Sequence, residues 1–189
     1  MRKVSLFMAL AVVLAGAVVA YGQTVIDSNT AFYQGENLRY VFPPARQLKM
    51  VSAEAIADGY SFAFIPRGDV YDSASMIVGV NIYKIRGLSF DSVITTDTSS
   101  LHSHYGPDVI IRPVDSVYAG SGEPLRTFYI DSKKRFLPNV MVSYFNGGTE
   151  IVIFELVIAP QSIRPKAEEL YIACLTNFKA LKLGTLGVK

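Results

Sequence analysis

Few side chains in this sequence could take part in catalysis or metal binding, and the strongest candidates are two histidines. His102 and His104 are the only histidines, and they are spaced as H-x-H. On a strand this spacing puts both imidazoles on one face, whereas on a helix they diverge by about 200°. A metal site here would also need a nearby carboxylate such as Asp97 or Asp108. We expect the alternative, two surface imidazoles near a helix end, where a protonated histidine interacts well with the helix dipole.

The single cysteine, Cys174, excludes a disulfide framework and a zinc site built from several thiolates of one chain. It could act as a nucleophile if it were paired with a histidine. It lies on the apolar face of a predicted helix, four residues before Phe178, where a free cysteine behaves as a small core hydrophobe. We therefore expect a buried and unreactive thiol, and we assign no catalytic residue.

Other short patterns point to turns and surface loops. Asp69 and Asp72 resemble a fragment of a calcium-binding loop, but the rest of the loop spacing is missing. Gly120-Ser121-Gly122 and Gly147-Gly148 do not open a helix after a strand, as a phosphate-binding loop does, so they predict turns. Lys133-Lys134-Arg135 is a basic tripeptide that we expect at a solvated hairpin tip. The sequence thus predicts no cofactor, and its only candidate metal ligands are the two histidines.

The aromatic content consists of eleven tyrosines and eleven phenylalanines without tryptophan. A tyrosine combines an apolar ring with a polar tip, so tyrosines gathered on one sheet face or in a cleft would form a binding surface. We favour the alternative, in which they are core and rim residues of a β-rich domain. The tyrosines concerned are Tyr60, Tyr71, Tyr83, Tyr105, Tyr118 and Tyr129.

The elements that must position these residues are β-rich runs and two amphipathic helices. A helix is predicted over 89–105, where Ser89 can cap it and apolar residues recur every three or four positions, except at Asp97. A second helix is predicted over 162–182, with Pro165 in its first turn. Residues 23–37 are expected to be a lead-in with one short strand or turn, and residues 48–57 fit either a helix or a strand. Strands are predicted over 38–42, 60–65, 76–85, 109–117, 125–131, 139–145 and 149–158.

This order of elements predicts the fold class. Short turn signals such as Asn146-Gly147-Gly148 join neighbouring strands, so antiparallel hairpins dominate. The run 76–85 has apolar residues on both faces, and the run 151–158 is apolar on both faces except at Glu155, which is typical of internal strands. We therefore predict an α+β domain, an antiparallel β-sheet of about six to seven strands with helices packed on it as a layered α/β/α sandwich.

Residues 1–22 have the three-part pattern of a secretory signal peptide. Arg2 and Lys3 precede an apolar stretch, and Ala20-Tyr21-Gly22 places small residues before Gln23. Cleavage there predicts one α+β domain over 23–189, with a core over about 38–182, in the periplasm or secreted. The alternative is an uncleaved segment that stays as a membrane anchor.

Composition excludes several classes of protein. With 50% hydrophobic residues the chain is not a disordered tail, and it has no long apolar run beyond its N-terminus, so it is not a polytopic membrane protein. The chain has 18 Lys and Arg against 16 Asp and Glu, and loss of the signal peptide leaves 16 against 16. A protein without excess positive charge lacks the electrostatic signature of nucleic-acid binding.

Several segments together resemble a known fold family. They are Phe64-Ile65-Pro66-Arg67-Gly68, Ala74–Val78, the helix from Ser89, Val140–Phe145, Ile151–Leu156, Ala167–Tyr171 and Leu175–Lys179. In this order they resemble the Mog1/PsbP-like fold, which includes small secreted bacterial proteins. The resemblance implies an antiparallel sheet between helical layers and a binding or accessory role, with no catalytic motif.

We therefore expect a secreted or periplasmic binding or accessory module. Its partner is an unknown protein or a small ligand, with no nucleic acid, and the chain is not an integral membrane protein after signal cleavage. The alternative function is a small metal-dependent hydrolase or other enzyme that uses His102 and His104.

Overall fold

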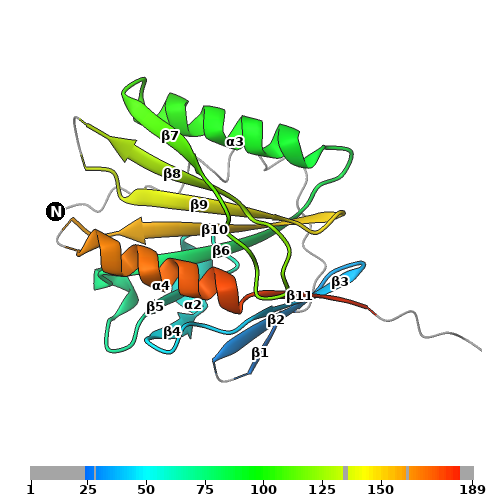
Figure 1. Ribbon diagram of the computed structural model, residues 1–189. Coiled ribbons are helices and arrows are strands. Elements are labelled where there is room, and N and C mark those ends of the chain that lie inside the picture. The colour runs from blue at the N-terminus through cyan, green and yellow to red at the C-terminus, as the bar shows by residue number, and fades with distance from the viewer. Residues whose placement is uncertain (1–23, 28, 134–135, 161, 184–189) are drawn as a thin grey trace, which may run out of the picture.

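Two antiparallel sheets make up the framework of the computed structural model, which describes residues 24–27, 29–133, 136–160 and 162–183 (Figure 1). The larger sheet consists of β4 (Leu48–Val51), β5 (Phe62–Pro66), β6 (Met76–Lys84), β7 (Val109–Val114), β8 (Arg126–Ser132), β9 (Asn139–Asn146) and β10 (Glu150–Ile158). Its spatial order is β4-β5-β6-β10-β9-β8-β7, so β6 and β10 are internal strands, as predicted. The predicted α+β class and the predicted size of this sheet are confirmed.

The smaller sheet was not predicted. It has the order β1-β2-β3-β11 and consists of β1 (Thr24–Asp27), β2 (Thr30–Gln34), β3 (Leu38–Phe42) and β11 (Lys179–Lys182). The lead-in before residue 38 therefore holds two strands, where one short strand or turn was expected. The predicted signal peptide over 1–22 lies outside the described residues.

The helices cover both faces of the larger sheet. They are α2 (Ala53–Ala57), α3 (Phe90–Tyr105) and α4 (Arg164–Asn177). Figure 1 shows α3 and α4 on either side of the sheet. Successive residues of a strand point to opposite faces, and β10 follows this rule: Ile151 and Ile153 pack beneath α3, whereas Val152 and Phe154 pack beneath α4. The sheet therefore separates two apolar cores.

Phe178 joins the smaller sheet to the core beneath α4. Its ring stacks on Phe42 of β3 at 5.0 Å between centroids. The same ring meets Phe154 of β10 and Phe145 of β9 edge-on, each at 5.2 Å. Because Phe178 is completely buried, the two sheets share one aromatic cluster and not merely a line of surface contact.

The prediction of one helix over 162–182 is wrong beyond Asn177. Phe178 leaves the helix with φ −60° and ψ 137°, and residues 179–182 then pair antiparallel with β3. Ala180 is buried while Leu181 is 45% exposed, which is the alternation of a strand. The apolar spacing of Phe178 and Leu181 also fitted a helix, but pairing with β3 satisfies this backbone instead.

The other boundaries differ from the predictions by only a few residues. Residues 48–57, which fitted a helix or a strand, contain both β4 and α2. Strand β7 ends at Val114, short of the predicted Val117. The predicted cap of α3 is confirmed, because Ser89 Oγ accepts a hydrogen bond from the Ser92 amide at 3.1 Å. The hairpin between β9 and β10 is also confirmed, with Gly148 at φ 84°.

Candidate functional site

The two histidines lie in the last turns of α3, with both side chains exposed. Residues two apart on a helix point about 200° away from each other, so the imidazoles do not converge. The carboxylates considered beside them have other partners: Asp97 accepts a hydrogen bond from Tyr144, and Asp108 accepts one from a serine of β8 at 2.7 Å. Within the described ranges, no three His, Cys, Asp or Glu side chains gather as a metal site.

Cys174 lies inside the core beneath α4, with 2% of its surface exposed. Burial raises the pKa of its thiol to about 11, so the thiolate is disfavoured. The histidines belong to α3 on the other face of the sheet. The structure thus places this thiol in the core position expected from the sequence, and away from both imidazoles.

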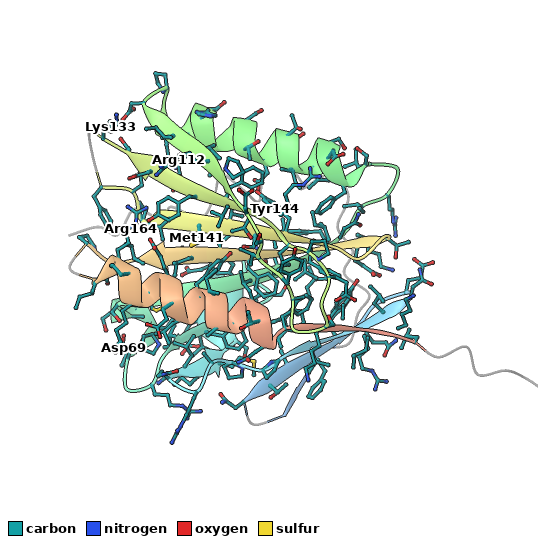
Figure 2. The ribbon with its side chains drawn as sticks, in the orientation of Figure 1. Asp69, Arg112, Lys133, Met141, Tyr144 and Arg164 are labelled. Atoms are coloured by element: carbon teal, nitrogen blue, oxygen red, sulfur yellow. The ribbon has the colours of Figure 1, made fainter. Side chains whose placement is uncertain are left out.

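The remaining sequence candidates serve as loop and surface residues. Asp69 closes its own loop, because its Oδ2 accepts hydrogen bonds from the amide and the hydroxyl of Ser75, each at 2.9 Å. Asp72 belongs to a 3-10 turn over 71–73. Lys133 is exposed at the end of the molecule where Figure 2 also places Arg112 and Arg164. The other two members of the basic tripeptide, Lys134 and Arg135, lie outside the described residues.

The tyrosines do not form one exposed binding face. Tyr60, Tyr71 and Tyr105 are buried, and Tyr118 is 51% exposed. Tyr129 is half-buried on β8, where its ring is covered by the guanidinium group of Arg164 at 4.6 Å. These are core and rim positions, as the sequence analysis favoured.

A pocket of about 580 Å³ lies where the two sheets meet. We call it the junction pocket. Four segments that are distant in sequence line it: the turn before β3, the loop before β8, the β9–β10 hairpin and the end of β11. The lining residues used below are Asn37, Leu38, Glu123, Asn146, Gly148 and Lys182. A volume of this size falls in the range typical of small-molecule sites, about 300–1,000 Å³.

Buried Glu150 fixes two of these segments to each other. Its Oε1 accepts a hydrogen bond from the Glu36 amide at 2.9 Å, and its Oε2 accepts one from Tyr40 Oη at 3.0 Å. Gly147 lets this approach happen, because a Cβ at that position would lie 2.1 Å from Tyr40 Oη. The β2–β3 turn and the β9–β10 hairpin are therefore held as one rigid wall of the junction pocket.

The loop that carries Glu123 is held against the end of α4. The Gly120 amide donates to the carbonyl of Phe178 at 2.7 Å, and the Ala119 amide donates to the carbonyl of Glu123 at 2.9 Å. A Cβ at Gly120 would lie 2.3 Å from the carbonyl oxygen of Thr176, so only glycine permits this close approach. Backbone contacts thus place Glu123 at the pocket.

The junction pocket presents opposite charges that do not pair with each other. Glu123 Oε2 is buried, and no described residue donates a hydrogen bond to it. Lys182 lines the same pocket from β11 and is exposed. A carboxylate, an ammonium group and the amides of Asn37 and Asn146 are groups that recognise polar ligands by hydrogen bonds and charge.

Sequence reasoning missed this site. Glu123 was assigned to a connecting loop, and Lys182 to the end of a helix. No local signal could have found them, because the pocket exists only after four distant segments have packed together. The glycines around Glu123 were the nearest clue, since a glycine in a loop can mark a close backbone approach.

The class of protein follows from the fold: an α+β domain with an antiparallel sheet between helical layers. No model of a known protein family matches the chain, and no curated protein is significantly similar in sequence. The structure is similar to the solution structure of cyanobacterial PsbP (CyanoP) from Synechocystis sp. PCC 6803. The TM-score is 0.47 and the sequence identity 11%, over 82% of this chain and 94% of that chain.

Within the described part of the chain, no helix is both long enough and apolar enough to cross a bilayer.

Proposed function

We propose that the chain is a binding or accessory module that acts in the periplasm or as a secreted protein, and that the junction pocket is its binding site. One observation carries the choice of site, the unpaired carboxylate oxygen of Glu123. A buried acceptor without a donor costs about 1–3 kcal/mol, so a ligand that supplies the donor is bound favourably. The terminal torsion of a glutamate is soft, which lets Glu123 turn this oxygen toward a ligand.

Within the pocket, the unpaired carboxylate of Glu123 favours a ligand with an amino group. An ammonium ion is a compact donor that can bond to Glu123 and to the amide oxygens of Asn37 and Asn146. Leu38 offers apolar contact for an attached carbon chain. Such a group is carried by a small amine or by the lysine side chain of a partner protein.

A binding experiment tests the junction pocket. Nα-acetyl-lysine amide is titrated into isotope-labelled protein while backbone amide shifts are followed by NMR, with Nα-acetyl-norleucine amide as the uncharged probe. We expect only the lysine probe to shift Gly148 and Leu183, which lie at the pocket. The response should vanish in Glu123→Gln and persist in Glu169→Gln, where an exposed glutamate of α4 is changed. Equal responses in both variants, or none in the unmodified protein, would contradict the proposal.

Export is tested separately. The proposed localisation rests on the signal pattern of residues 1–22, so the mature N-terminus should lie at or near Gln23. Intact-mass measurement of the exported protein checks this. Met1 retained on soluble, exported protein would refute it.

A further inference from the structure

Two carboxyl groups are buried together between α3 and the larger sheet. Asp97 comes from the middle of α3 and is 9% exposed, and Glu155 comes from β10 and is 7% exposed. In the sequence these were the two exceptions in otherwise apolar patterns. We call them the carboxyl pair. They have no part in the junction pocket, so what they do is independent of the function proposed above.

The partners of the carboxyl pair are tyrosine hydroxyls. Tyr144 of β9 donates to Asp97, and Figure 2 shows its position in the layer below α3. Tyr60, which precedes β5, donates to Glu155 Oε2 at 3.2 Å. Burial raises the pKa of Tyr83 on β6, and the nearby charges of Glu155 and Asp97 raise it further. Among the described residues, no donor reaches Glu155 Oε1 and no cation pairs with either carboxyl group.

A buried and largely apolar layer cannot hold two negative charges at low free energy. Burial raises the pKa of Glu155 to about 8, and the nearby charge of Asp97 adds to the rise. Burial also raises the pKa of Asp97 to about 6, although its hydrogen bond from Tyr144 lowers it in part. Both groups therefore hold a proton more tightly in the folded state than in water.

The raised pKa values make the folded state less stable as the pH rises. A group whose pKa is raised by folding stabilises the folded state fully below its unfolded pKa. For Glu155 this stabilisation declines as the pH rises from the ordinary value of 4.5 and is lost at about 8. The packing of Asp97 and Glu155 thus weakens as the solution becomes more alkaline.

Helix α3 is the element that should lose the most stability when the carboxyl pair ionises. Serine and threonine, which are weak helix formers, fill much of its outer face. Thr98, Ser100 and Ser103 bond to carbonyl groups four residues earlier, an arrangement that slightly destabilises helices. What keeps α3 in place is therefore its buried stripe, and Asp97 lies in the middle of that stripe together with Val93, Ile94, Leu101 and Tyr105.

We propose that the carboxyl pair is a proton-controlled latch, which keeps α3 docked on the sheet while at least one of Asp97 and Glu155 is protonated and releases it when both are ionised. The released state is a local opening, because β10 remains paired with β6 and β9 on either side. The latch therefore responds to the proton concentration of the solution.

Amide hydrogen exchange measured by NMR tests the latch. After correction for intrinsic exchange, the opening equilibrium of α3 should rise at least about tenfold between about pH 6 and about pH 9. The amides of β10 should keep their protection over the same range. Glu155→Gln should remove most of the rise, because a glutamine still accepts from Tyr60 but cannot ionise. Glu169→Gln, on the exposed face of α4, should leave it unchanged.

Two results would overturn the proposal. One is an α3 opening equilibrium that changes with pH equally in the unmodified protein and in Glu155→Gln. The other is a simultaneous loss of protection in α3 and β10, which would mean that the pair acts on the whole fold. If Glu155→Gln does not fold, Asp97→Asn, which still accepts from Tyr144, provides the same comparison.

Discussion

Phe178 is the residue at which the fold depends most on one side chain. It is completely buried and contacts aromatic rings of both sheets. Truncation to alanine removes these contacts and leaves a cavity that the surrounding strands cannot fill. We expect Phe178→Ala to lower the free energy of unfolding by about 3–5 kcal/mol, measured by urea denaturation.

Leu181 supplies the matched control for that experiment. It lies three residues further along and is 45% exposed. Most surface substitutions change stability by less than about 0.5 kcal/mol, so Leu181→Ala should unfold almost as the unmodified protein does. A loss below about 1 kcal/mol for Phe178→Ala would show that its ring is not in the core.

Cys174 is expected to be inert in the folded protein. Its thiol is buried and its pKa is raised to about 11, so little thiolate forms near pH 8 and a reagent cannot reach it. A thiol reagent at that pH should label the native protein slowly and the denatured protein completely. Rapid labelling without denaturant would restore the nucleophile hypothesis.

At the scale of elements, the α4–β11 boundary shows how far the sequence could predict this fold. The stripe of Leu170, Cys174 and Phe178 has helical spacing, and nothing local ends it at Asn177. Strand β11 forms because β3 offers an unpaired edge, and that edge is visible only in the assembled structure. The hairpins and α3 were predicted well because their signals, a Gly-rich turn and a serine cap, are local.

The helical geometry of α3 gives a test of the metal hypothesis. His102 and His104 point to different sides of the helix, so one metal ion cannot reach both. Replacement of both by glutamine should leave stability almost unchanged. Zinc or copper should then shift the melting temperature of the unmodified protein no more than that of the double variant. A shift of several degrees that disappears in the double variant would contradict this expectation.

At the scale of the whole molecule, Glu150 links the two sheets. This fully buried carboxyl group of β10 accepts from Tyr40 of β3. Tyr40→Phe leaves one carboxylate oxygen without its donor, and we expect a loss of about 1–3 kcal/mol in unfolding free energy. Tyr33→Phe is the control, since Tyr33 is similarly buried on β2 and its hydroxyl makes no hydrogen bond to another described residue like the one that Tyr40 makes to Glu150. Equal losses in the two variants would mean that the hydrogen bond to Glu150 is unimportant.

The junction pocket forms only when distant segments of the folded chain pack together, which is why the sequence did not reveal it. Glu123, Asn146 and Lys182 are unremarkable in their own segments. They become neighbours only because Gly120 lets a loop press against the end of α4 and because β11 pairs with β3. Periodicity predicts elements, but it carries no information on which loops will meet.

The pairing of β11 with β3 limits the order in which parts of the chain can fold. The strand that closes the smaller sheet follows its partner in the chain by more than the whole larger sheet, so it is synthesised after all seven strands of that sheet. Until residues 178–182 emerge, the aromatic core between the sheets lacks Phe178 and cannot consolidate. Such long-range closure slows folding. We therefore expect the docking of β11 onto β3 to be a late step of folding.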